Sequence, residues 1–177
     1  MDRDEIESNL RALGSRLAAH DLTGEILLLG GGAHMTLVIR NREATKDIDA
    51  YFASDPSSIR TAAAEVAKER GLPPDWLNDA VKGFIHRQPD RTDRWASYPG
   101  LNVYTPNPEY VFAMKAEAGR AGSSDFDDLT ALKERLGLTE LAQGLAIVEK
   151  YVPARRLSAK TKLTLESLFE NEGEGRR

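Results

Sequence analysis

The stretch from Gly24 to Phe52 constrains the fold of this chain more than any other part of the sequence. It begins with a continuous apolar run, Ile26 to Leu29, which is typical of a strand that is buried on both faces. Three consecutive glycines, Gly30 to Gly32, end that run, and a short helical pattern from Ala33 to Ile39 follows. A second strand is predicted from Asp47 to Phe52, and it opens with two carboxylates separated by one residue. This order of elements is typical of a site that holds phosphate and metal.

Helical and extended patterns on either side of this stretch predict a mixed fold of the α/β (α+β) class. Helices are predicted from Asp4 to Ala19, from Pro56 up to Gly71, from Pro73 through Val81, and in several stretches after Pro108. A short strand is predicted from Leu101 to Thr105, whereas residues 86–97 are polar and show no period. We therefore expect a small mixed sheet flanked by helices in residues 1–106 and an all-helical part in residues 107–177, packed together as a single compact unit.

The composition excludes thiol chemistry and gives no sign of a membrane span. The 177 residues include no cysteine, which rules out disulfides, thiolate metal ligands and cysteine nucleophiles. No apolar run approaches the roughly 20 residues that a bilayer span needs. The acidic and then amphipathic start, Met1 to Glu7, is unlike a signal peptide, so we expect a cytoplasmic protein.

Charge and histidine spacing narrow the possible ligands. A net charge of −4 argues against a protein that coats nucleic acid, although a nucleic-acid substrate held by a local patch stays open. We interpret one local basic cluster as the solvated start of a helix; it consists of Arg155, Arg156, Lys160 and Lys162. The three histidines, His20, His34 and His86, lack the spacing of zinc ligands. His34 and the aromatic residues Trp76, Trp95, Tyr98 and Tyr104 are interpreted as packed side chains.

The two carboxylates and the three glycines predict complementary halves of one site. Alternate side chains of a strand share a face, so Asp47 and Asp49 should project together while Ile48 points into the core. Two carboxylates this close repel each other unless a cation lies between them, and their oxygens suit Mg²⁺ or Mn²⁺. An Asp-x-Asp pair alone is more often a pair of surface acids. The glycines favour the interpretation as a metal-and-phosphate site, because they expose backbone N–H groups and the positive end of a helix to an anion.

This segment resembles the nucleotidyltransferase superfamily (polymerase-β-like), whose members have Gly-Gly or Gly-Ser, a helix, and Asp-x-Asp on the next strand. Either Gly30-Gly31 or Gly31-Gly32 is the matching pair. The run Arg42-Glu-Ala-Thr-Lys-Asp-Ile-Asp49 is particularly similar to a minimal bacterial branch that includes the AbiEii-type and MenT-type toxins. That branch also has a Lys-x-x-Ala-x-Arg helix followed by Asp-x-x-Asp-Leu. Two later segments are similar to these motifs, namely Lys115-Ala-Glu-Ala-Gly-Arg120 and Asp125-Phe-Asp-Asp-Leu129.

The resemblance implies a role for each of these residues. Asp47 and Asp49 would bind the metal, and Lys115 would contact the nucleotide phosphates. The implied nucleotide-binding residues are Gly30, Gly31, Gly32, Thr45, Lys46 and Arg120. Asp128 would act as an acid or base near the acceptor or would orient Lys115, and Asp125 is the less secure match for its position. The superfamily often has a third carboxylate on a following strand, but residues 101–105 offer none, which leaves Asp75 or Asp79 to compensate.

The function implied by the resemblance is transfer of a nucleoside monophosphate from a nucleoside triphosphate (NTP) to an acceptor hydroxyl, with Mg²⁺ or Mn²⁺ as cofactor. The acceptor would be RNA such as tRNA, a protein or a small molecule. The chain would then be part of a toxin–antitoxin pair, with an antitoxin protein as partner, or of a phage-defence system. Two alternatives stay open: a catalytically silent relative that binds a nucleotide or a protein partner, and a helical interaction protein whose Asp-x-Asp pair is incidental.

Overall fold

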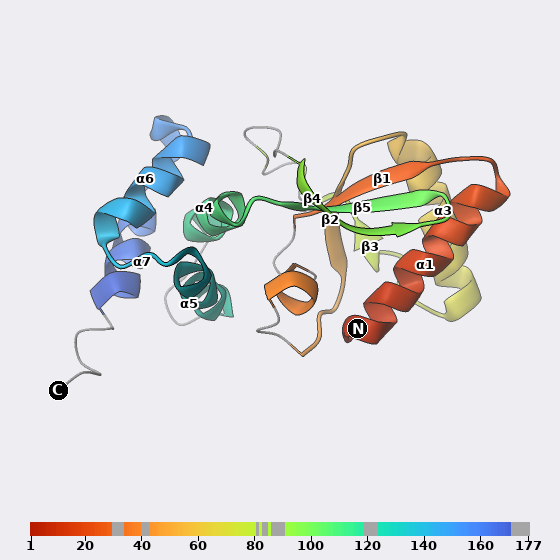
Figure 1. The fold of residues 1–177 in the computed structure, drawn as a ribbon, viewed down its shortest axis with the longest axis horizontal. Coiled ribbons are helices and arrows are strands. Elements are labelled where there is room, and N and C mark those ends of the chain that lie inside the picture. The colour runs from red at the N-terminus through yellow and green to blue at the C-terminus, as the bar shows by residue number, and fades with distance from the viewer. Residues whose placement is uncertain are drawn as a thin grey trace. The chain divides into compact units, whose positions relative to one another are not determined.

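The computed structural model describes residues 1–29, 34–39, 43–80, 82, 85, 91–118 and 124–170. These residues form two compact units. The first contains the sheet and ends at Pro106, and the second consists of the helices from Asn107 onward (Figure 1). The fold is therefore mixed α and β, with a helical C-terminal part. Within the described ranges, no helix combines the length and the apolar character of a membrane span.

The first unit is built on a mixed five-stranded sheet with the order β3-β2-β1-β5-β4. The strands are β1 (Gly24–Leu28), β2 (Ile48–Phe52), β3 (Leu77–Asn78), β4 (Arg91–Tyr98) and β5 (Leu101–Pro106). Strand β1 lies in the centre, antiparallel to β2 and parallel to β5. The outer pairs are β2 with β3, which is parallel, and β5 with β4, which is antiparallel.

Helices α1 (Arg3–Ala19) and α3 (Pro56–Arg70) cover one face of this sheet (Figure 1). Helix α1 begins with a capping box in which Asp2 and Glu5 satisfy each other's backbone N–H groups. Its buried stripe is Ile6, Leu10, Leu13 and Leu17, as the sequence predicts. These side chains pack with those of α3 and with alternate residues of the strands, including Ile26, Leu28, Ile48 and Ala50. The other face of the sheet therefore carries the intervening residues of each strand.

Sequence patterns predicted most of these elements, and the structure differs at four places. The second strand begins at Ile48, so Asp47 lies one residue before it. The helix predicted from Pro73 through Val81 is wrong, because Leu77 and Asn78 form the edge strand β3. The polar stretch that showed no period contains most of β4. Between β1 and β2, the described part of the predicted helix is a π-helical segment, Met35–Ile39.

The second unit consists of α4 (Pro108–Ala118), α5 (Ser124–Leu136), α6 (Leu141–Tyr151), a short 3₁₀ turn (Ala154–Arg156) and α7 (Ala159–Glu170). Helix α4 is central because it contacts α5, α6 and α7. Its residues Tyr110 to Ala113 are all buried. Helix α6 approaches α7 closely at Gly144, where an added Cβ atom would lie 2.9 Å from the ring of Phe169. This unit therefore has an apolar core of its own.

Candidate functional site

Asp47 and Asp49 stand at the start of β2, on the side of the sheet that α1 and α3 leave uncovered. Ile48 is fully buried in the core beneath those helices, whereas Asp49 is half-buried and points to the opposite face. Asp47 is also half-buried. On this face of the sheet, Leu27 of β1 lies in register between Tyr51 of β2 and Tyr104 of β5. The alternation predicted from the sequence is therefore confirmed for Ile48 and Asp49.

Leu29, the residue before the triple glycine in the sequence, lies beside Asp49. The backbone N–H of Leu29 donates a hydrogen bond of 3.2 Å to the carbonyl oxygen of Asp49. Gly30, Gly31 and Gly32 follow Leu29 in sequence, and they lie outside the described residues, so the phosphate-binding turn stays a prediction.

Asn78 is a member of this site that the sequence did not reveal. Strand β3 pairs with β2 so that Asn78 is in register with Asp49. Its side-chain Nδ2 lies 3.4 Å from Oδ2 of Asp47 and donates to it, and its Oδ1 accepts from the backbone N–H of Ala80 at 3.0 Å. Strand β3 has only two residues, too few for a periodic signal, so no pattern in the sequence pointed to Asn78.

Thr45 and Lys46 lie on the segment that leads into the acid pair. The Thr45 hydroxyl donates to the carbonyl oxygen of Asp47 at 3.0 Å. The Thr45 backbone N–H donates to the carbonyl oxygen of Met1 at 2.8 Å, which fixes this segment against the start of α1. Lys46 is exposed. Of the other predicted nucleotide contacts, Arg120 lies outside the described residues.

Neither candidate for a third carboxylate joins the acid pair. Asp79 forms an ion pair with Arg60, and Asp75 is exposed. Among the residues that the structure describes, no group of three or more His, Asp or Glu side chains is placed to hold a metal ion. The candidate ligands at the start of β2 are therefore the carboxylates of Asp47 and Asp49, and Asn78 donates to Asp47 through its amide nitrogen. Mg²⁺ commonly takes one or two protein carboxylates, with water and phosphate completing its octahedron, so these residues fit that ion.

Lys115 and Asp128 are brought together in the second unit. Nζ of Lys115 lies 2.5 Å from Oδ2 of Asp128, and their side chains are 8% and 1% exposed. Lys115 is on α4 and Asp128 is on α5, thirteen residues later. This geometry matches the interpretation of Asp128 as the partner that orients Lys115. Helix α5 begins at Ser124, so Asp125 lies within its first turn rather than ahead of it.

The weaker candidates are packed side chains. His34 is fully buried. Trp76 is also fully buried, and its indole N–H donates to the carbonyl oxygen of Ala63 on α3 at 3.0 Å. Tyr98 packs partly against the core, with the guanidinium of Arg11 5.2 Å from its ring centre. The hydroxyl of Tyr104 donates to Oε1 of Glu25 at 3.3 Å.

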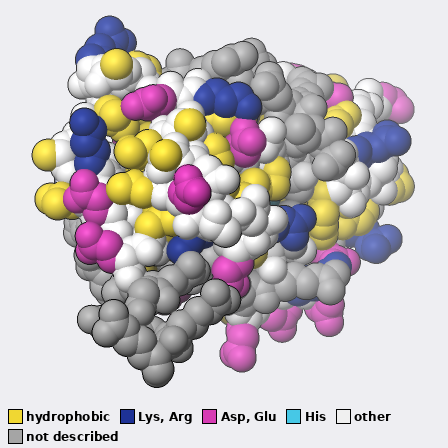
Figure 2. Space-filling model, turned by 60° about the vertical axis from the view of Figure 1, so that its left-hand side comes forward, with side chains coloured by type: hydrophobic (Ala, Val, Ile, Leu, Met, Phe, Trp, Pro, Cys, Tyr) yellow, Lys and Arg dark blue, Asp and Glu magenta, His cyan; other side chains and the backbone are white. Residues whose placement is uncertain are grey.

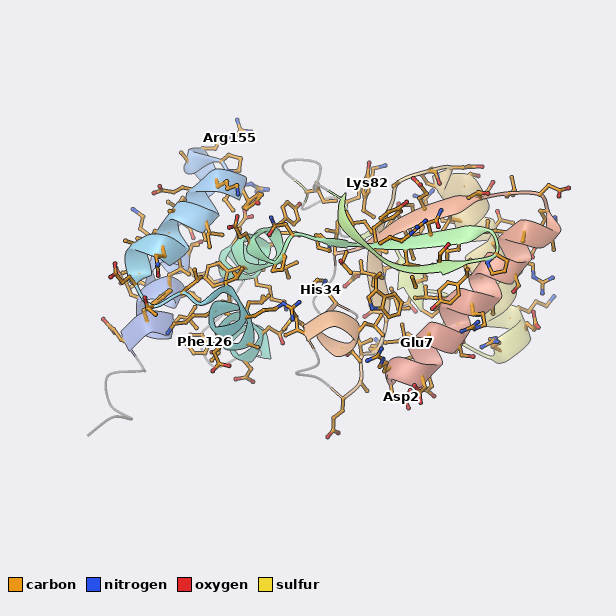
Figure 3. All side chains as sticks on the ribbon, viewed as in Figure 1. Asp2, Glu7, His34, Lys82, Phe126 and Arg155 are labelled. Atoms are coloured by element: carbon orange, nitrogen blue, oxygen red, sulfur yellow. The ribbon has the colours of Figure 1, made fainter. Side chains whose placement is uncertain are left out.

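The basic cluster is exposed, and half of it contacts α4. Arg155 projects outward from the helical unit (Figure 3). Arg156 lies 3.7 Å from Glu117, and Lys160 donates to the carbonyl oxygen of Ala118 at 3.2 Å. On the face drawn in Figure 2, basic and acidic side chains are interspersed over the coloured residues. These contacts agree with the interpretation of the cluster as the start of a helix.

Comparison of the chain with models of protein families, with curated proteins and with solved structures gave no match.

Proposed function

We propose that the chain is a metal-dependent nucleotidyltransferase that moves a nucleoside monophosphate from an NTP to an acceptor hydroxyl. One observation supports the proposal: Leu29, which directly precedes the triple glycine in the sequence, donates a backbone hydrogen bond to Asp49, and Asp49 and Asp47 are the two carboxylates at the head of β2. Backbone N–H groups at such a turn suit phosphate, and the carboxylates suit Mg²⁺ or Mn²⁺. A nucleotide with its bound metal ion supplies both the phosphate for the N–H groups and the cation for the carboxylates.

In this reaction, the acceptor oxygen bonds to the α-phosphorus while the bond from that phosphorus to the bridging oxygen of pyrophosphate breaks. Asp47 and Asp49 would hold the metal, which would supply charge neutralisation at the phosphates. The sequence resemblance alone assigns the Lys115 ammonium, which is paired with Asp128 in the second unit, to the charge of the leaving pyrophosphate. The hydroxyl proton leaves to solvent or to a carboxylate. RNA such as tRNA, a protein and a small molecule are the acceptor classes, and a toxin–antitoxin or phage-defence role with an antitoxin partner follows from the sequence resemblance alone.

Calorimetric titration with each NTP in the presence of Mg²⁺ tests the site. We expect binding that requires the metal and that Asp49→Asn weakens at least tenfold, because one of two metal-binding charges is lost. Asp79→Asn is the matched control, since Asp79 pairs with Arg60 and should leave nucleotide binding unchanged. Equal binding by Asp49→Asn and the wild type would remove the site assignment.

A catalytically silent nucleotide-binding protein is the second candidate. It is favoured by the engagement of the Lys115 ammonium with Asp128 in a buried ion pair. Labelled NTPs incubated with tRNA, with total protein and with small hydroxyl compounds separate the two functions. Label transferred to any of these acceptors, and lost in Asp47→Asn, supports the transferase. Metal-dependent binding without transfer to any acceptor supports the silent binder.

A further inference from the structure

Asn78 is fixed in place by an anchor that is independent of the acid pair. Trp76, two residues earlier, is fully buried and its indole N–H donates to Ala63 of α3. The carbonyl oxygen of Trp76 accepts from the backbone N–H of Ile48 at 2.7 Å, which attaches β3 to the start of β2. A strand of only two residues is therefore held at both the helix and the sheet.

The side-chain amide of Asn78 is also oriented. Its oxygen accepts from the N–H of Ala80 at 3.0 Å, which is a local turn that Asn and Asp side chains commonly form. This bond directs the amide nitrogen toward Asp47, whose Oδ2 is 3.4 Å away. The same nitrogen lies 3.5 Å from the carbonyl oxygen of Asp75. The amide thus presents an N–H donor, and no negative charge, to the carboxylate.

The absence of charge at this position has an electrostatic consequence. With Asp47 and Asp49 ionised, Asn78 leaves this end of β2 with two negative charges, where an acid would leave three. One further negative charge beside the acid pair would strengthen the attraction of a cation, because charges about 4 Å apart still interact appreciably at an effective dielectric constant of about 20. The free protein should therefore hold a divalent cation weakly, and the phosphates of a nucleotide supply the missing ligands.

We propose that Asn78 is a positioning residue of the acid pair: it holds the Asp47 carboxylate ready for a divalent cation and, being neutral, makes tight metal binding depend on nucleotide. The inference rests on the proposed function, because it assigns Asn78 to the same metal site. Hydrogen-bonding partners of ligating carboxylates typically contribute 10- to 100-fold to metal affinity, so this role has a measurable size.

The test is Mn²⁺ binding by the full chain, followed by the electron paramagnetic resonance signal of free Mn²⁺, without nucleotide and with a non-hydrolysable NTP analogue. Asn78→Ala should weaken Mn²⁺ binding about tenfold, because Asp47 loses its donor. Asn78→Asp should strengthen binding about tenfold or more without nucleotide and reduce the gain that the analogue brings. Opposite effects of the two variants distinguish positioning at the site from a general role in β3, which would weaken binding in both.

Three controls give each result a single meaning. Asp79→Asn, on the next residue, should leave Mn²⁺ affinity unchanged, and urea unfolding should show that all variants are folded. If wild-type Mn²⁺ binding does not depend on Asp49, both the proposed function and this inference are overturned. If binding depends on Asp49 but both Asn78 variants match the wild type or shift in the same direction, the inference alone is overturned.

A second measurement uses the metal-free protein. The NMR resonances of the Asn78 side-chain amide should shift in Asp47→Ala, and unchanged resonances would equally overturn the inference.

Discussion

The Lys115 ammonium and the Asp128 carboxylate, 2.5 Å apart and 8% and 1% exposed, join α4 to α5 inside the second unit. Removing one partner of such a buried pair leaves the other charge without its counterion. We expect Asp128→Ala to lower the free energy of unfolding by about 3 kcal/mol or more, as measured by urea unfolding. The double variant Lys115→Met/Asp128→Leu should recover part of that loss. A change below about 0.5 kcal/mol in Asp128→Ala would contradict a structural role for the pair.

Trp76 should stabilise the first unit through both its ring and its indole N–H. Trp76→Phe keeps an aromatic ring in the core but removes the donor to Ala63, so we expect a loss of about 1–3 kcal/mol in unfolding free energy. Trp95 is only half-buried, and Trp95→Phe is the matched control with a smaller expected loss. Urea unfolding followed by circular dichroism measures both variants. Equal losses of unfolding free energy in the two variants would show that the hydrogen bond from Trp76 to Ala63 adds no particular stability.

Gly14 allows α1 to approach the turn between β4 and β5. An added Cβ atom would lie 2.6 Å from the carbonyl oxygen of Pro99, so Gly14→Ala should destabilise the unit by about 1–3 kcal/mol. This sign opposes the gain of about 0.5–1 kcal/mol that alanine normally brings inside a helix.

Gly71 is the control for Gly14, because it lies at the end of α3 with φ +65° and an added Cβ atom would meet nothing within 4 Å. Gly71→Ala should cost only the strain of the left-handed conformation, about 1 kcal/mol. Thermal unfolding of the two variants gives the comparison. A more stable Gly14→Ala protein would refute the close approach.

Tyr110 should make the second unit sensitive to alkaline pH. Burial, with a smaller contribution from the charge of Glu117, raises the pKa of Tyr110 to about 12. The folded state therefore retains the phenolic proton between pH 10 and 12, where the unfolded state has lost it. The free energy of unfolding should fall across this interval, by at most about 1.4 kcal/mol per pH unit.

Tyr110→Phe keeps the edge-to-face packing on Tyr151, whose ring centre is 5.4 Å away, and removes the titrating group. Urea unfolding at several alkaline pH values should therefore show a shallower fall for this variant than for the wild type. Parallel pH profiles for the two proteins would rule out the effect.

Local signals were sufficient to predict the long helices and the acid pair. The apolar stripe from Ile6 to Leu17 and the Asp55 and Gly71 ends of α3 are encoded by neighbouring residues, and the structure confirms them. Asp47 and Asp49 were recognisable because their spacing and their place after the glycines are local features as well.

Features that depend on distant partners were not predictable in this way. Strand β3 has two residues, and what makes it a strand is its pairing with β2, about thirty positions earlier. Strand β4 lies at the other edge of the sheet, where a polar sequence without an apolar period is tolerated. The sequence did not reveal Asn78 because this residue belongs to β3, whose conformation depends on its pairing with β2. The proximity of Lys115 to Asp128 depends on the packing of α4 against α5, which sequence spacing does not specify.

Strand β3 has a further consequence for the sheet. Among the described residues, β3 pairs with β2 at Ile48 and Asp49 alone, so β3 itself does not extend along the outer edge of β2 from Ala50 onward. An extended apolar edge would recruit strands from other molecules. Here the guanidinium of Arg60 lies 5.9 Å from the ring centre of Phe52 and pairs with Asp79, which sets opposite charges beside this edge. A very short edge strand with a charged flank should therefore disfavour the addition of strands from other molecules at this edge.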